Sequence, residues 1–168
     1  MFVLIAGPPG SGKSTLARPL AEQLNLPLIA KDPIKEALMD VLGWPDSVEE
    51  SRTLGRAAVM AMLEVASTSG GAVLESTFFP YAYPRISALP GSLIEVRCRC
   101  PAAVAQARYR ERSGRRHRGH LDLDRQPDEL WSEESSRPLG IAPVIVVDTT
   151  APVDVADLAT RIQRLVRG

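Results

Sequence analysis

The chain has 168 residues, the length of one globular domain, of which 45% are hydrophobic and 24% are charged. Twenty Lys and Arg residues balance 20 Asp and Glu residues, so the formal net charge at pH 7 is zero. These values exclude disordered, collagen-like and disulfide-dense proteins, and they argue against a protein that coats nucleic acid or an anionic membrane through bulk charge.

Short apolar runs alternate with longer helical patterns along the chain. The expected strands cover residues 2–6, 26–30, 72–74, 93–98 and 144–147, and the expected helices cover residues 14–24, 33–42, 49–67, 102–113, 128–135 and 153–166. Strands that are nearly all apolar are typical of a parallel sheet covered by helices on both faces. Because the sequence has no internal repeat and no dividing linker, it predicts one α/β domain over residues 1–168.

The sequence predicts no membrane association. It contains no run of 18 apolar residues, and its first six residues, MFVLIA, lack the basic start of a signal peptide. We therefore expect a cytoplasmic protein.

The strongest motif lies directly after the first expected strand. Residues 7–15, GPPGSGKST, fit the phosphate-loop pattern G-x-x-x-x-G-K-[ST], with a strand before it and a helix after it. Glycines let the backbone amides surround a phosphate, and the helix N-terminus adds a favourable dipole. Lys13 is expected to neutralise charge between the β- and γ-phosphates, and Ser14 is expected to ligate Mg²⁺. The nucleotide-binding residues expected in this loop are Gly7, Gly10, Ser11, Gly12, Lys13, Ser14 and Thr15.

This loop and the order of the elements around it resemble the small P-loop kinases, which include chloramphenicol phosphotransferase, the kinase domain of polynucleotide kinase, gluconate kinase and the zeta toxins. The resemblance covers nearly the whole chain in element order and is specific at the phosphate loop. It implies the P-loop NTPase fold, α/β in class, with a five-stranded parallel sheet in the adenylate-kinase-like order 2-3-1-4-5. It also implies ATP and Mg²⁺ as cofactors and a short Arg-rich lid at about residues 113–127.

Two acidic residues follow expected strands. Asp32 occupies the position where the resembling kinases carry an acid, which implies that it orients and deprotonates the acceptor hydroxyl. Asp32 followed by Pro33 is also a favourable helix N-cap, and the two roles are compatible. Glu75 ends the third strand, where these kinases more often carry Asp. Its role is open between holding Mg²⁺, reaching the acceptor and facing solvent at a strand end.

Four of the chain's eight aromatic residues lie within positions 78–83. They predict either core packing or a pocket wall for an acceptor with a ring or an apolar body. Trp44 is expected to approach the same cleft, and Arg85 to bind an anionic or hydroxyl-rich part of the acceptor. The expected acceptor-binding residues are Asp32, Trp44, Glu75, Phe78, Phe79, Tyr81 and Arg85.

Seven arginines and three acids lie between residues 108 and 125, which gives this segment a charge of +4. The planar guanidinium binds phosphate oxygens in a bidentate manner, so a phosphate-binding lid is one interpretation and a solvated basic stretch is the other. Arg108 and Arg112 share a helical face, and Arg112 with Arg115 or Arg116 is the expected phosphate-binding pair. The expected catalytic residues are Lys13, Asp32, Arg112 and Arg116.

Two further expectations concern the lid and the adenine. Gly114 and Gly119 would give the lid the freedom to close over the phosphates. The resemblance also implies that the loop after the last strand, with Thr149 and Pro152, contacts the adenine.

The leading hypothesis is an ATP-dependent kinase that phosphorylates a hydroxyl of a small-molecule acceptor such as an antibiotic, a nucleoside or another metabolite. The first alternative is a 5′-hydroxyl kinase of nucleic acid or nucleotides, which the near-neutral charge disfavours. The second is a nucleotide-binding regulatory ATPase, which would need no acceptor. Both a monomer and a homodimer are compatible with the sequence.

Overall fold

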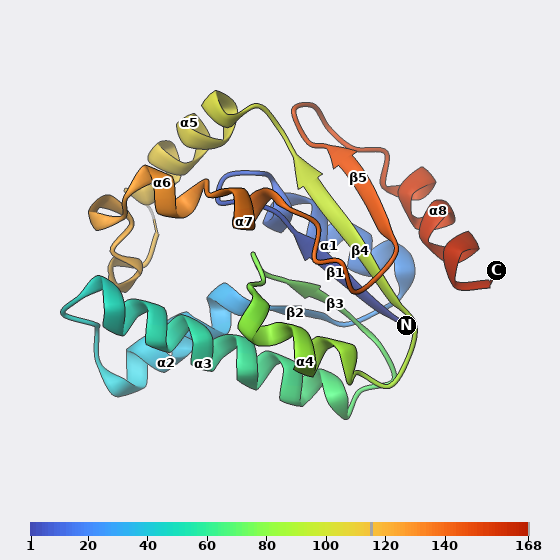
Figure 1. The fold of residues 1–168 in the computed structure, drawn as a ribbon, viewed down its shortest axis with the longest axis horizontal. Helices are drawn as coiled ribbons and strands as arrows, with labels where there is room; N and C mark the ends of the chain where they lie inside the picture. Colours follow the sequence, from blue (N-terminus) through green and yellow to red (C-terminus); the bar gives the residue numbers. More distant parts are fainter. Residues whose placement is uncertain (115, 168) are drawn as a thin grey trace.

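The computed structural model describes residues 1–114 and 116–167. Five parallel strands lie side by side in the order β2-β3-β1-β4-β5 (Figure 1). The strands are β1 (Phe2–Ala6), β2 (Leu28–Ala30), β3 (Ala72–Glu75), β4 (Leu93–Arg99) and β5 (Val144–Asp148). The helices are α1 (Lys13–Leu24), α2 (Lys31–Leu42), α3 (Val48–Ser67), α4 (Tyr83–Ser87), α5 (Ala102–Ser113), α6 (Pro127–Leu130), α7 (Glu133–Ser136) and α8 (Val155–Arg167). The predicted α/β class and strand order are confirmed.

Strand β1 is the centre of the sheet. It pairs with β3 on one side and β4 on the other, and all five of its residues are fully buried. Successive side chains of a strand point to opposite faces, so both faces of β1 are covered. Val3 and Ile5 pack with α1 and α8, whereas Phe2 and Leu4 pack with α3 and α4. This double burial explains why the strand is apolar at every position.

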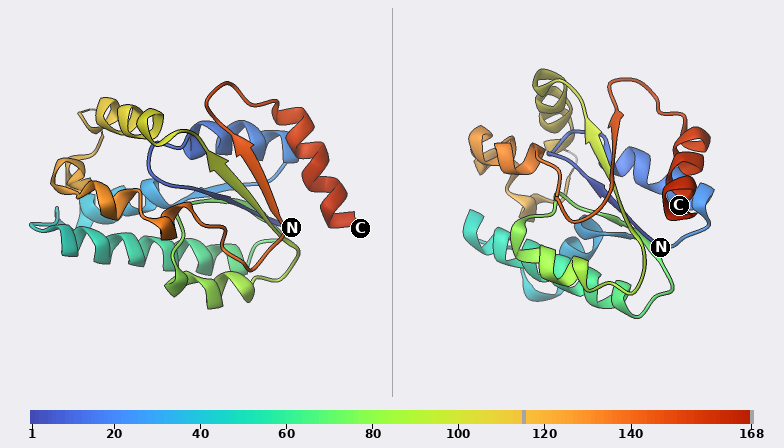
Figure 2. Two further views of the ribbon diagram at one scale, coloured as in Figure 1. Left: turned by 45° about the horizontal axis from the view of Figure 1, so that its top comes forward. Right: turned by 45° about the vertical axis from the view of Figure 1, so that its right-hand side comes forward.

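The helices form one layer on each face of the sheet (Figure 2). Helices α1 and α8 cover one face, and α3 and α4 cover the other. Helix α4 was not expected from the sequence, because a helix of five residues is too short to show a helical period. Among the described residues, no helix combines the length and the apolar character needed to cross a bilayer.

The helices expected over residues 33–42 and 128–135 differ from the structure. Helix α2 begins at Lys31 with Ala30 as its N-cap, so the N-cap role expected for Asp32 is wrong. Asp32 lies instead in the first turn of α2, where the helix dipole favours a carboxylate. The single helix expected over residues 128–135 is two short helices, because the Ser132 side chain accepts a hydrogen bond from the amide of Ser135 and starts a new helix.

Candidate active site

A cavity of about 860 Å³ opens at the carboxyl ends of the central strands. In parallel α/β sheets, ligands bind at this edge, where the strand order reverses. Its volume lies within the range of small-molecule sites. The residues expected at the site that line it are Gly10, Gly12, Lys13, Ser14, Thr15, Asp32, Glu75, Phe79, Tyr81, Arg108, Arg112 and Arg116.

The phosphate loop is packed so closely that its glycines are required. Gly10 has a φ of +77°, and a Cβ there would lie 2.1 Å from the carbonyl oxygen of Ala105 in α5. Gly12 has a φ of +84° and precedes α1 without a side-chain cap. The first amides of α1 therefore lack a capping side chain and are available to an anion. This backbone arrangement fits a bound phosphate.

Lys13 is folded back onto the phosphate loop. Its ammonium donates hydrogen bonds to the carbonyl oxygens of Gly7, at 2.7 Å, and Pro8, at 2.8 Å. Burial lowers the pKa of Lys13 to about 8, although nearby Glu75 acts in the opposite direction. Phosphate oxygens would favour the charged form of this side chain.

Ser14 and Glu75 form a pair of oxygen ligands beside the loop. The Ser14 hydroxyl donates to a Glu75 carboxylate oxygen at 3.3 Å. Glu75 is only 6% exposed, so the alternative of a solvent-facing carboxylate is wrong. Burial raises the pKa of Glu75, while Lys13 opposes this shift. Hydroxyl and carboxylate oxygens are ligands that Mg²⁺ prefers, so this donor set fits the expected metal.

Asp32 is held between two cations. Lys31 lies 2.6 Å from one carboxylate oxygen, and Arg116 of the lid forms an ion pair with the other. Burial alone would raise the pKa of Asp32, but Lys31 and Arg116 outweigh it and hold the pKa well below its usual range. The same Arg116 guanidinium bonds both carboxylate oxygens of Asp122 at 3.0 Å. Asp32 is therefore ionised and tied to the lid.

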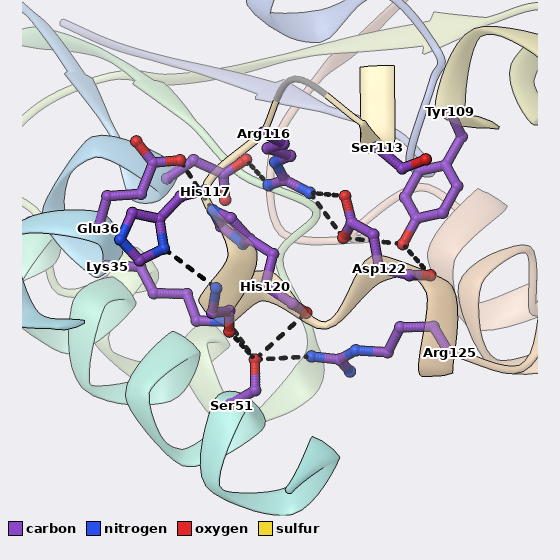
Figure 3. Close-up of polar contacts among 12 residues, drawn as sticks. Lys35, Glu36, Ser51, Tyr109, Ser113, Arg116, His117, His120, Asp122 and Arg125 are labelled. Atoms are coloured by element: carbon purple, nitrogen blue, oxygen red, sulfur yellow. Dashed lines mark hydrogen bonds and ion pairs between the residues drawn. The ribbon is translucent and has the colours of Figure 1, made fainter. Parts of the chain in front are cut away.

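The lid segment after Arg116 lies against α2 and α3 (Figure 3). Lys35 donates to the Ser51 hydroxyl at 2.6 Å, and Ser51 donates to the carbonyl oxygen of Gly119 at 3.0 Å. His120 contacts Glu36 at 2.8 Å, and burial lowers the pKa of His120 to about 4.

The two glycines of the lid differ in their surroundings. A Cβ at Gly119 would lie 2.6 Å from the sulfur of Met39, so glycine is needed there for close packing against α2. At Gly114, by contrast, a Cβ would meet nothing within 4 Å. The freedom to close that was expected of both glycines stays a prediction.

Two lid contacts were missed by the sequence analysis. The Trp131 indole, just after the lid, donates to the carbonyl oxygen of Pro9 at 3.0 Å and so links this segment to the phosphate loop. The Tyr109 hydroxyl donates to Asp122 at 2.9 Å, and its ring lies edge-on to Trp131. The only sign of these contacts in the sequence is that Trp131 is an isolated aromatic residue after the Arg-rich segment.

A buried ion pair in β4 was also missed. Arg97 lies 2.7 Å from Glu95, and both side chains are at most 5% exposed. Arg97 donates to the carbonyl oxygen of Ser135, and Glu95 accepts from the amide of Leu139. Through these two hydrogen bonds, the ion pair holds the segment from Ser135 to Leu139 against the sheet.

Several residues expected at the site do not line the cavity. Phe78 has a left-handed φ of +54° and is buried in the core, with 1% exposed. Trp44 is 57% exposed and packs edge-on against His117. Arg85 pairs with Glu64 at 2.8 Å on the exposed side of α3 and α4. Arg115 lies outside the described residues.

The loop after β5 supports the phosphate loop from behind. Thr149 is buried, and its hydroxyl donates to the carbonyl oxygen of Ser11 at 2.7 Å. Arg108 donates to the carbonyl oxygens of Thr149 and Thr150 at 3.0 and 3.2 Å. Pro152 is exposed and does not line the cavity. The observed contacts of Thr149 are thus with the protein backbone.

Replacing Thr149 by valine is expected to lower the free energy of unfolding by about 1–3 kcal/mol, because a buried backbone carbonyl would lose its donor. Urea unfolding measures this difference. Thr150→Val, at an exposed position in the same loop, is the control and should have little effect. Equal stability of the two variants would show that the Thr149 hydroxyl does not support the loop.

The comparisons with known proteins agree with this geometry. Residues 3–69 match the family described as "ATPase family associated with various cellular activities (AAA)". A cytidylate kinase from Sulfurisphaera tokodaii is 32% identical over 81 residues, which cover 45% of this chain and 45% of that enzyme. The matched stretch is thus less than half the length of this curated relative.

Solved structures match over almost the whole chain. A protein of Chloroflexus aurantiacus, described as a "putative kinase", is 32% identical with a TM-score of 0.82, and the match covers 98% of this chain and 97% of that one. A gluconokinase from Sinorhizobium meliloti has a TM-score of 0.62 at 19% identity, covering 98% of this chain and 93% of that chain. The second similarity shows the shared fold alone.

Proposed function

Because the chain belongs to the small P-loop kinases, we propose that it transfers the γ-phosphate of ATP to a hydroxyl group of a small-molecule acceptor. The observation that carries this proposal is that one cavity contains both the Lys13 phosphate loop and the ionised carboxylate of Asp32. A regulatory ATPase needs the first of these features but not the second.

The nucleotide end of the cavity is basic. Lys13 and the amides at the start of α1 would bind the phosphates. Burial lowers the pKa of Arg112, and among the described residues its buried Nε has no hydrogen-bond partner. An unsatisfied buried donor is costly, and a phosphate oxygen would satisfy it. Ser14 and Glu75 would hold Mg²⁺, which would supply positive charge against the phosphates when it is bound.

At the acceptor end, Asp32 supplies the group that orients the hydroxyl. The acceptor oxygen forms a bond to the γ-phosphorus while the bond from that phosphorus to the bridging oxygen breaks, and the hydroxyl proton passes to the Asp32 carboxylate. Phosphoryl transfer needs positioning and charge stabilisation more than a strong base, so a carboxylate with a low pKa suffices. Arg116 would move from Asp32 to the transferring phosphate.

The proposal is tested by incubating [γ-³²P]ATP with a panel of small alcohols and a 5′-hydroxyl oligonucleotide. The wild type is expected to label a small alcohol, and Lys13→Ala is expected to lower this turnover by about 10²–10³-fold because it removes a phosphate-binding cation. Arg18→Ala, which removes an exposed cation from the same helix, is the control and should keep the wild-type rate.

Two results would contradict the proposal. Label on the oligonucleotide alone would identify a polynucleotide kinase. No labelled acceptor, together with ATP hydrolysis that Asp32→Asn leaves unchanged, would identify a regulatory ATPase.

A further inference from the structure

Gly55 lies in the middle of α3, a helix of 20 residues, and it lines the cavity. Glycine is the least favourable residue in a helix interior apart from proline, so its presence there needs a reason. A positive φ is not the reason, because Gly55 is not among the positive-φ glycines of the described chain. Close packing is not the reason either, because a Cβ at Gly55 would meet nothing within 4 Å. The fold therefore does not require glycine at this position.

The open space at Gly55 belongs to the cavity wall. The residues of α3 that line the cavity recur at the spacing of one helix face, and they are Glu49, Ser51, Arg52, Gly55, Arg56 and Val59. Every other member of this face carries a side chain. Gly55 thus leaves a stretch of bare helix backbone in the middle of the wall.

An aromatic turn borders the same part of the cavity. Phe79 and Tyr81 line it, and the Arg56 guanidinium lies over the Tyr81 ring at 5.9 Å from the ring centre. Arg56 follows Gly55 in α3, so this contact joins the helix that carries the glycine to the aromatic turn. A bare stretch of helix backbone and the flat face of an aromatic ring both suit a planar group.

The charges beside this space are already compensated. Arg52 lies 2.7 Å from one carboxylate oxygen of Glu129, and Arg125 lies 2.8 Å from the other. Arg52 also lies 3.1 Å from Glu49, so these two arginines and two glutamates balance in charge, while the Arg56 guanidinium lies over the Tyr81 ring. The phosphate-binding groups lie elsewhere, on the loop that contains Lys13 and on α5.

We propose that the space over Gly55 is an acceptor slot, which holds a ring of the acceptor between the α3 backbone and the Phe79–Tyr81 turn. Gly55 is then a specificity-determining residue, because any side chain at position 55 would occupy the space of the ring. The proposal rests on the kinase function proposed above and adds the class of acceptor, an alcohol that carries a ring.

The test fills the slot with Gly55→Leu. Nucleosides and phenyl-substituted alcohols serve as ring-bearing probes, and glycerol and sorbitol serve as acyclic probes. We expect the wild type to prefer the ring-bearing alcohols, and Gly55→Leu to raise their KM by about 10–200-fold while the KM for ATP stays unchanged. Ala57→Leu adds the same bulk to the exposed side of α3 and should behave as the wild type.

Three further variants cover the case in which Gly55→Leu fails to fold. Gly55→Ala is expected to raise the melting temperature, because alanine is the better helix former, and to raise the KM for ring-bearing alcohols. Tyr81→Ala is expected to weaken ring binding by about 5–150-fold through lost stacking, whereas Tyr81→Phe should restore it.

Calorimetric binding of the same probes, with a non-hydrolysable ATP analogue present, separates this inference from the kinase proposal. Ring-bearing alcohols that bind the wild type but not Gly55→Leu support the slot even if no phosphate is transferred, an outcome that contradicts the kinase proposal alone. The slot is overturned if the wild type and Gly55→Leu bind or phosphorylate ring-bearing alcohols equally, or if the wild type prefers the acyclic probes.

Discussion

Asp32→Asn is expected to lower kcat by about 10²–10⁴-fold, the range for loss of a group that takes a proton in the transition state. Asparagine keeps the size of the side chain and its ability to accept a hydrogen bond, but it cannot take the proton. Nucleotide affinity should not fall, because Lys13, Ser14 and the loop amides are unchanged. Steady-state kinetics and nucleotide titration measure the two quantities separately.

Asp40→Asn is the matched control for this experiment. Asp40 lies on the same helix, where it contacts His117 and is 67% exposed. It should therefore keep the wild-type kcat. A kcat of Asp32→Asn close to that of the wild type would remove Asp32 from the mechanism. A parallel loss of nucleotide affinity would assign it a role in binding instead.

Lys35→Met is expected to raise the free energy of unfolding by about 3–5 kcal/mol at pH 6, with the gain shrinking as the pH rises towards 10. Lys35 is 2% exposed, and burial lowers its pKa from 10.5 to about 7. Below pH 7 the lysine is charged in both states, so the folded protein carries the full cost of a buried ammonium. Between pH 7 and 10.5 the unfolded chain binds a proton that the folded chain has released, so wild-type stability rises with pH.

Urea unfolding at pH 6, 8 and 9.5 measures this effect. Burial also lowers the pKa of Lys13, to about 8, but Lys13 contributes the same rise to the wild type and to Lys35→Met. The difference between the two proteins therefore isolates Lys35. Ser51→Ala keeps the lysine but loses its hydroxyl partner, and should retain the pH dependence. A constant difference between Lys35→Met and wild type at all three pH values would contradict a lowered pKa.

The positions of the strands could be predicted because they depend on short contiguous stretches of sequence. The strands are mostly apolar runs, and the phosphate loop is a contiguous motif whose glycines are needed for conformation and close approach. The burial of Glu75 could not be predicted from the sequence, because a polar residue at a strand end can face either the cavity or solvent. Its contact with Ser14 joins positions 61 residues apart.

The lid contacts were not predictable from local patterns. Trp131 and Pro9 are 122 residues apart, and the Ser51 hydroxyl meets Gly119 across 68 residues. Such pairs depend on how the helices cross, which no periodicity encodes. The aromatic residues after β3 could not be assigned to the core or to the cavity from the sequence either. Phe78 points into the core because of its positive φ, whereas Phe79 and Tyr81 line the cavity.

The position of Arg116 between Asp32 and Asp122 couples proton binding to lid position. Arg116 contributes to the low pKa of Asp32, so any ligand that draws this guanidinium away increases the affinity of the carboxylate for a proton. By thermodynamic reciprocity, protonation of Asp32 weakens the hold on Arg116 to the same extent. Nucleotide arrival would thus strengthen the base at the moment when a proton has to be accepted.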